Sequence, residues 1–184
     1  MAELKGQKFA IGLSDEPEHL WVCYTVDGIE NEFELTNVCN VLGDMLSSLV
    51  TLLTNPSQLW DESNAVGFVW YSESDSYNWT LSLAAGGVLR IRITQTCEFF
   101  GEDEVELVNT ECPVFDFVGC VVKELDRFIK SVGMLNFLQH WKAYEFPTTY
   151  FLFLKKHLMD DGLWHNSTDK KGNVLTDESK LLLS

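Results

Sequence analysis

The feature that most constrains the fold is residues 65–99, which contain three strand-like segments separated by two short connections. Tyr77–Leu83 and Val88–Cys97 alternate apolar and polar residues, as in strands with one buried and one solvated face. Val66–Tyr71 has large apolar residues on both faces, which is typical of an interior strand. Strands joined by short turns are antiparallel neighbours. We therefore expect an antiparallel sheet built around these three strands.

Charged side chains occupy two places in this region. The first turn carries Glu73 and Asp75, and the third strand carries Arg90 and Arg92 on its polar face. A carboxylate pair can serve acid–base chemistry, but Asp and Ser also favour turns, so a solvated turn is the simpler interpretation. For the two arginines the simpler interpretation is cross-strand ion pairing. The functional alternative is that the arginines bind a partner, together with Glu73 or Asp75.

Three further strands are expected in the first part of the chain, at Lys8–Leu13, His19–Val26 and Ile29–Leu35. Asp27-Gly28 lies between the second and the third and is a strong hairpin signal. In Ile29–Leu35, acidic residues alternate with mostly apolar ones, so the strand would present an outward row of carboxylates, formed by Glu30, Glu32 and Glu34.

Apolar residues at helical spacing predict a helix over residues 38–54 and a long amphipathic helix over residues 114–132 that ends at Gly133. Two shorter helices are expected at Met134–Tyr144 and Thr148–Met159. The predicted class is α+β: an antiparallel sheet of about five or six strands with helices packed on one face, in the order β-β-β-α-β-β-β-α-α-α. Residues 1–160 would form a single domain and residues 161–184 a polar tail.

The formal net charge of −15 bears on possible partners. It repels phosphate backbones, which argues against nucleic acid, and it would attract a basic protein. Acidic residues concentrate in Asp15–Glu34 and in Glu98–Glu111, and the second group is expected to lie in a loop (Phe99–Asn109) containing Glu102, Asp103 and Glu104. We expect these acidic segments to be the main partner-binding surface.

The sequence contains none of the catalytic, phosphate-binding or metal-binding motifs with characteristic spacing. We therefore expect no enzyme activity, cofactor or metal, and interpret the four histidines as solvated or buried in the core. The five cysteines are widely spaced and odd in number, which suits reduced thiols in the cytoplasm. No apolar run approaches the roughly 20 residues that a membrane span requires, and the first residues lack the apolar core of a signal peptide.

Two aromatic-rich motifs carry a resemblance to known proteins. One is F-x-W-x-x-E-x-x-x-Y-x-W-x-L, which here begins at Phe68 and precedes the strand L-R-I-R-I, and the other is G-x-x-x-F-L-x-x-W-x-x-x-E-F-P, from Gly133 to Pro147. Together they resemble a loose group of uncharacterised bacterial proteins, some of them similar to immunity proteins of polymorphic toxin systems. The resemblance covers roughly residues 40–158 and implies no catalytic residue.

Three functions stay open at this point. The first is a non-enzymatic acidic binding protein, such as an immunity-like inhibitor that masks a basic protein partner. The second is a small-molecule-binding domain or an enzyme of unrecognised type, which would need a pocket lined by Trp70, Trp79, Arg90 and Arg92. The third is a structural or regulatory homo-oligomer, and the sequence does not indicate an oligomeric state.

Overall fold

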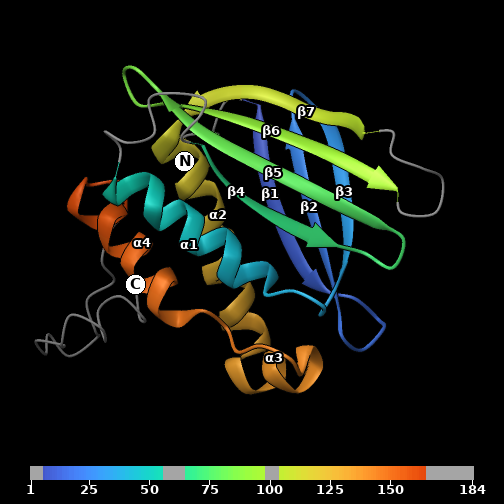
Figure 1. Ribbon diagram of the computed structural model, residues 1–184. Helices are drawn as coiled ribbons and strands as arrows, with labels where there is room; N and C mark the ends of the chain where they lie inside the picture. The colour runs from blue at the N-terminus through green and yellow to red at the C-terminus, as the bar shows by residue number, and fades with distance from the viewer. Residues whose placement is uncertain (1–5, 56–64, 98–103, 165–184) are drawn as a thin grey trace, which may run out of the picture.

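The computed structural model describes residues 6–55, 65–97 and 104–164. In these ranges the chain forms two antiparallel sheets, of three and four strands, together with four helices (Figure 1). This arrangement confirms the predicted α+β class.

The three-stranded sheet is formed by the first part of the chain, in the order β1 (Gln7–Leu13), β2 (His19–Val26) and β3 (Ile29–Thr36). The turn between β2 and β3 is tight because Asp27 and Gly28 both adopt positive φ, of 51° and 82°, as a two-residue hairpin requires. Alternate residues of the three strands point inward and are buried: Phe9, Ile11, Leu20, Val22, Tyr24, Phe33 and Leu35.

The four-stranded sheet has the order β4 (Val66–Tyr71), β5 (Asp75–Ala84), β6 (Val88–Cys97) and β7 (Glu104–Pro113). Strand β7 corrects the prediction of an acidic loop for residues 104–109, while residues 99–103 lie outside the described residues. A β-bulge between Ile93 and Thr94 pairs Ile93 with Val108 and Thr94 with Glu106, which leaves Leu107 as the extra residue of β7. The bulge interrupts the alternation of apolar and polar residues that would have predicted a strand. The acidic residues of β7 therefore led to the prediction of a loop.

The prediction of one sheet of five or six strands is also corrected, because β3 and β4 do not pair and the seven strands divide into two sheets. Aromatic rings join the inner sides of these sheets: Phe33 of β3 contacts Trp70 and Tyr77, and Tyr24 of β2 contacts Trp79. The carboxylate row of β3 therefore does not share a sheet with the arginines of β6.

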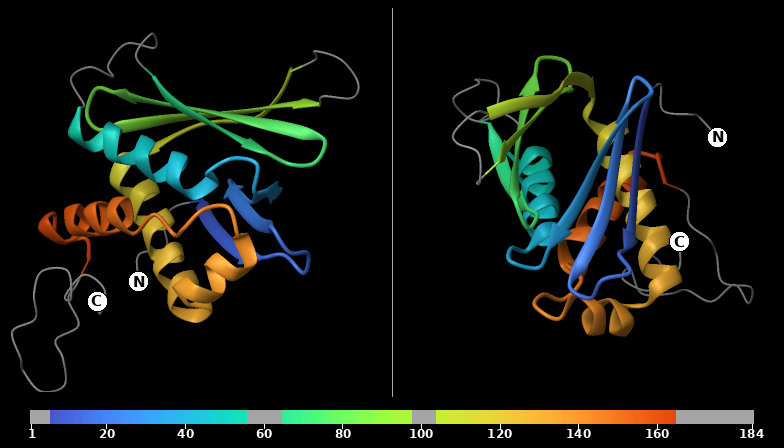
Figure 2. Two further views of the ribbon diagram at one scale, coloured as in Figure 1. Left: turned by 60° about the horizontal axis from the view of Figure 1, so that its bottom comes forward. Right: turned by 90° about the vertical axis from the view of Figure 1, so that its right-hand side faces the viewer.

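Four helices complete the fold: α1 (Val41–Thr54), α2 (Val114–Val132), α3 (Met134–Trp141) and α4 (Thr148–Asp160). Helix α2 ends before Gly133 as predicted, and α1 begins three residues later than predicted because Asn40 caps it, its side-chain oxygen accepting from the Gly43 N–H at 3.2 Å. Figure 2 shows the helices on one side of the four-stranded sheet, and none of the described helices or strands covers its other face. None of the described helices is long and apolar enough to cross a membrane.

Helix α2 also covers the β1 edge of the three-stranded sheet. The Ile11 N–H, which points away from β2, donates to a carboxylate oxygen of Glu124 at 3.4 Å, and burial raises the pKa of the Cys120 thiol one turn earlier. An unpaired strand edge is a site for unwanted strand addition, so α2 protects β1 from it.

Candidate functional site: an acidic pocket where the two sheets meet

The most chemically distinctive site lies where one end of each sheet comes together. The turn before β2, the end of β3 and the turn between β4 and β5 enclose a pocket of about 330 Å³. Its lining is almost entirely polar and consists of Glu16, His19, Glu34, Ser72, Glu73, Ser74, Asp75 and Tyr77.

The turn between β4 and β5 is held by the hydroxyl of Ser72. This oxygen accepts hydrogen bonds from the backbone N–H groups of Ser74, at 3.4 Å, and Asp75, at 2.9 Å. The Ser74 hydroxyl in turn donates to the Asp75 carboxylate at 2.9 Å. Small polar residues favour such turns through these local bonds. The turn fixes the backbone of Glu73, whose side chain is 81% exposed.

The turn before β2 is anchored by α3 and the residue that follows it. The Glu18 N–H donates to the His140 carbonyl at 3.0 Å, and the His140 Nε2 donates to the carbonyl of His19 at the same distance. The Lys142 ammonium lies 2.7 Å from the Glu18 carboxylate and holds the pKa of that carboxyl below its usual range. These long-range bonds fix the backbone on both sides of the His19 Cα.

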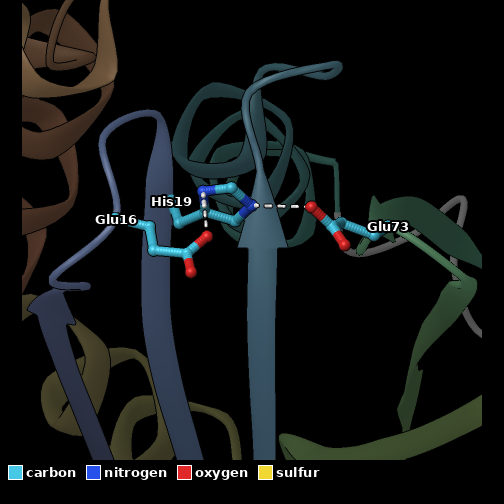
Figure 3. A group of neighbouring side chains, drawn as sticks. All are labelled: Glu16, His19 and Glu73. Atoms are coloured by element: carbon cyan, nitrogen blue, oxygen red, sulfur yellow. Dashed lines mark ion pairs between the residues drawn. The ribbon is translucent and has the colours of Figure 1, made fainter.

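The imidazole of His19 lies between two carboxylates, as Figure 3 shows. Nδ1 is 3.9 Å from Glu16 Oε2, and Nε2 is 3.8 Å from Glu73 Oε1. Nδ1 is also 3.1 Å from the Pro17 carbonyl oxygen. Because a carbonyl can only accept, Nδ1 carries the hydrogen, and Nε2 is the nitrogen that faces Glu73.

The pocket is strongly acidic. Among the described residues, its lining contains four carboxylates and no Lys or Arg, so His19 is the only one of these lining residues that can carry a positive charge. Glu34 is oriented by the Ser14 hydroxyl, which donates to its carboxylate at 3.1 Å. A cation entering this pocket would meet the negative field of these four carboxylates.

Glu34 connects the pocket to the outer side of the three-stranded sheet, which we call the acidic face (Trp21, Glu30, Glu32 and Glu34). The three glutamates are exposed, and Trp21 lies directly across from Glu34 with 38% of its surface exposed. Gly12 is the β1 neighbour of Trp21, and a Cβ at Gly12 would lie 3.7 Å from the indole ring. The ring is therefore supported from β1 and keeps part of its surface free.

Part of the predicted site is thus assembled by the fold. Glu34, Glu73 and Asp75, separated by up to 41 positions in sequence, line one pocket. Glu30 and Glu32 extend the same acidic surface along β3.

Arg90 and Arg92 do not join this site. Both lie on the outer face of the four-stranded sheet and form ion pairs with β7: Arg90 with Glu111 at 2.7 Å, and Arg92 with Glu106 at 2.8 Å and Glu104 at 3.4 Å. Arg92 holds the pKa of Glu106 below its usual range. The cross-strand ion-pair interpretation is therefore confirmed, and Glu104 is engaged by an arginine of its own sheet.

Of the two remaining expectations, one stays untested and the other is wrong. Glu102 and Asp103 lie outside the described residues. The alternative pocket lined by Trp70, Trp79, Arg90 and Arg92 does not form. The two tryptophans point into the core and are at most 1% exposed, while the two arginines lie on the opposite face of the sheet. The Trp70 Nε1 donates to the Val41 carbonyl at 3.1 Å, which fixes that ring against α1.

Sequence reasoning missed Glu16, His19 and Trp21. Side chains alternate between the two faces of a strand, so Trp21 lies on the other face of β2 from the buried Leu20 and Val22. This alternation could have predicted the exposure of Trp21. For Glu16 and His19 the signal was weaker. They are three residues apart around a turn containing Pro17, but their meeting with Glu73 depends on the contact between the sheets.

No protein-family model, no curated protein and no solved structure matches this chain.

Proposed function

We propose that this protein is a non-enzymatic binding protein whose acidic face and adjoining pocket contact a basic protein partner. The observation that carries the proposal is the continuity of carboxylates around an exposed tryptophan. The row on β3 runs into the pocket through Glu34, and Trp21 stands beside that junction.

The two components of this surface have different physical roles. A cluster of like charges steers an oppositely charged partner and raises the association rate, an effect that salt screens. A rigid, partly exposed tryptophan contributes contact area at low entropic cost and is the residue type that most often dominates interface energies. The indole of Trp21 is supported by β1, so little freedom would be lost when a partner covers it.

An immunity-like inhibitor is the specific form of this proposal. The aromatic motifs that resemble immunity-like bacterial proteins form the core here, since Phe68, Trp70 and Trp79 are at most 6% exposed. They would specify the scaffold, while the acidic face would mask a basic toxin such as a nuclease in the cytoplasm. This role requires no catalysis by the protein itself.

Replacing Trp21 with alanine should weaken partner binding by about 2 kcal/mol, roughly 30-fold in the dissociation constant, because a central aromatic anchor is lost. The measurement is a pull-down from the source cell on the immobilised protein, followed by titration calorimetry with the basic protein that the wild type retains. Circular dichroism and thermal melting would show that the variant keeps its fold.

The electrostatic component is tested by removing three charges from one of two places. A triple variant carrying Glu→Gln at 30, 32 and 34 should slow association about tenfold or more at roughly 50 mM salt and have little effect at roughly 500 mM. The matched control carries Glu→Gln at 104, 106 and 111, which removes the same number of charges from β7. Equal losses in both variants would show that net charge, and not the acidic face, governs binding, and would refute the proposal.

A further inference from the structure

We propose that the pocket is a binding site for a divalent metal ion of the zinc class, with His19, Glu73 and Glu16 as its protein ligands. One ligand atom from each of these residues lies within 4.8 Å of the others. This site would require no protein partner.

The imidazole is oriented as a metal ligand would be. Its Nδ1–H donates to the Pro17 carbonyl at 3.1 Å, which leaves the Nε2 lone pair directed at the pocket and at Glu73 Oε1, 3.8 Å away. Histidines that bind metals commonly donate their other ring N–H to a backbone carbonyl in this way. In this tautomer Nε2 and the Glu73 oxygen are both acceptors, and a cation between them would be bound by both.

The separations also suit coordination. With zinc bonds of about 2.1 Å, tetrahedral ligand atoms lie about 3.4 Å apart. This is slightly less than the 3.8 Å between His19 Nε2 and Glu73 Oε1, and less than the 4.8 Å within which one ligand atom from each of the three residues lies. The imidazole is held in place, with 15% of its side chain exposed. The two glutamates are 72% and 81% exposed, so they are free to turn inward by the small distance required.

The donor set indicates which metal fits. One imidazole nitrogen with two carboxylates suits Zn²⁺ and its neighbours Co²⁺ and Mn²⁺, with Zn²⁺ expected to bind more tightly than either. Ca²⁺ and Mg²⁺ prefer oxygen ligands throughout, so His19 would contribute nothing to their binding. The two carboxylates balance the charge of the ion, and Glu34 or Asp75, which line the same pocket, or a water can complete the coordination.

Calorimetric titration of Zn²⁺ into chelator-treated, metal-free full-length protein tests the site. We expect one ion per chain, and Co²⁺ bound in its place should give the visible absorption of a four-coordinate complex. His19→Ala should weaken Zn²⁺ binding by more than the roughly 10- to 100-fold that loss of an outer-shell partner typically costs. Glu73→Gln should weaken Zn²⁺ binding at least about tenfold. Because the Glu73 side chain is highly exposed, this loss could not be attributed to unfolding of the variant.

The matched control is a double Glu→Gln variant at 30 and 32, which removes two carboxylates from β3 but none from the pocket. It should change the dissociation constant by less than about threefold, the effect of screened surface charge. The proposal is overturned if the wild type binds Zn²⁺ no more tightly than Ca²⁺, or if His19→Ala binds Zn²⁺ as the wild type does. Either result would mean that the pocket merely attracts counterions or holds a protonated imidazole between two glutamates.

The metal titration contains no partner, and the partner-binding measurement can be repeated with a chelator present. Zn²⁺ binding without partner binding would refute only the proposed function. Partner binding in chelator, from a protein that binds no Zn²⁺, would refute only the metal site.

Discussion

Replacing Asp126 with asparagine is expected to destabilise the protein by about 3 kcal/mol, because it leaves a buried ammonium without its carboxylate. Lys155 of α4 is 0% exposed, and its Nζ lies 2.8 Å from Asp126 Oδ1 on α2. The rings of Phe151 and Trp164 lie 5.6 Å and 4.8 Å from the same Nζ. These aromatic faces attract the ammonium but do not replace the carboxylate. Urea denaturation at neutral pH measures the change in free energy of unfolding.

Lys155→Met is the matched variant and should cost less than about 1 kcal/mol. Methionine fills much of the same space, and Asp126 retains its second partner, Lys130, at 2.8 Å. The double variant should recover most of the stability lost in Asp126→Asn, because no unpaired ammonium is then buried. Equal losses in the two single variants would show that the pair contributes mainly packing and would contradict the argument.

The cost of Asp126→Asn should also decrease as the pH rises. Burial already lowers the pKa of Lys155 in the wild type, against the attraction of Asp126. Without that carboxylate the folded-state pKa falls further, while the unfolded-state pKa stays near about 10.4. Between these two values the unfolded chain binds more protons than the folded one, so stability rises with pH. This rise should begin at lower pH in the variant, and denaturation at neutral and mildly alkaline pH measures it.

The fold was predictable wherever local pattern and burial agree. The α2 boundaries followed from apolar periodicity and Gly133, and the hairpin between β2 and β3 followed from Asp27-Gly28. Strand β7 was missed because its bulge shifts the apolar residues by one position. The division into two sheets was also missed, because it depends on contacts between distant aromatic rings that no local pattern encodes.

In the candidate site, too, the parts set by local pattern were predictable and the parts set by tertiary contacts were not. The outward carboxylates of β3 are local, since alternation alone places Glu30, Glu32 and Glu34 together. The meeting of His19 with Glu73 is tertiary, because it requires α3 to fix one turn and the contact between the sheets to bring the other to it. The burial of Lys155 could not be predicted from the sequence either, since a lysine in an apolar helix normally extends its ammonium to solvent.

Replacing Phe33 with alanine is the second large effect, with an expected loss of about 4 kcal/mol. Phe33 is 0% exposed and is the residue of β3 that meets the aromatic rings of the other sheet. Its ring centroid lies 4.9 Å from that of Tyr77 and 5.7 Å from that of Trp70, both close to edge-on, and 5.9 Å from that of Trp79. Alanine would leave a cavity between two sheets that share no strand pairing, and thermal and urea denaturation would measure the loss.

A double-mutant cycle separates this contact from general core packing. Phe33→Leu combined with Tyr77→Leu should show a coupling of about 1 kcal/mol, because the two rings meet edge to face. Phe33→Leu combined with Phe137→Leu is the control, since Phe137 belongs to a separate group of rings with Phe128, Trp141 and Phe146 and should couple by less than about 0.5 kcal/mol. Because the pocket lies where the sheets meet, a coupled Phe33–Tyr77 pair would also hold His19 and Glu73 at their separation. If the first cycle is as additive as the control, the aromatic contact does not hold the two sheets together, and another part of the core must position the pocket.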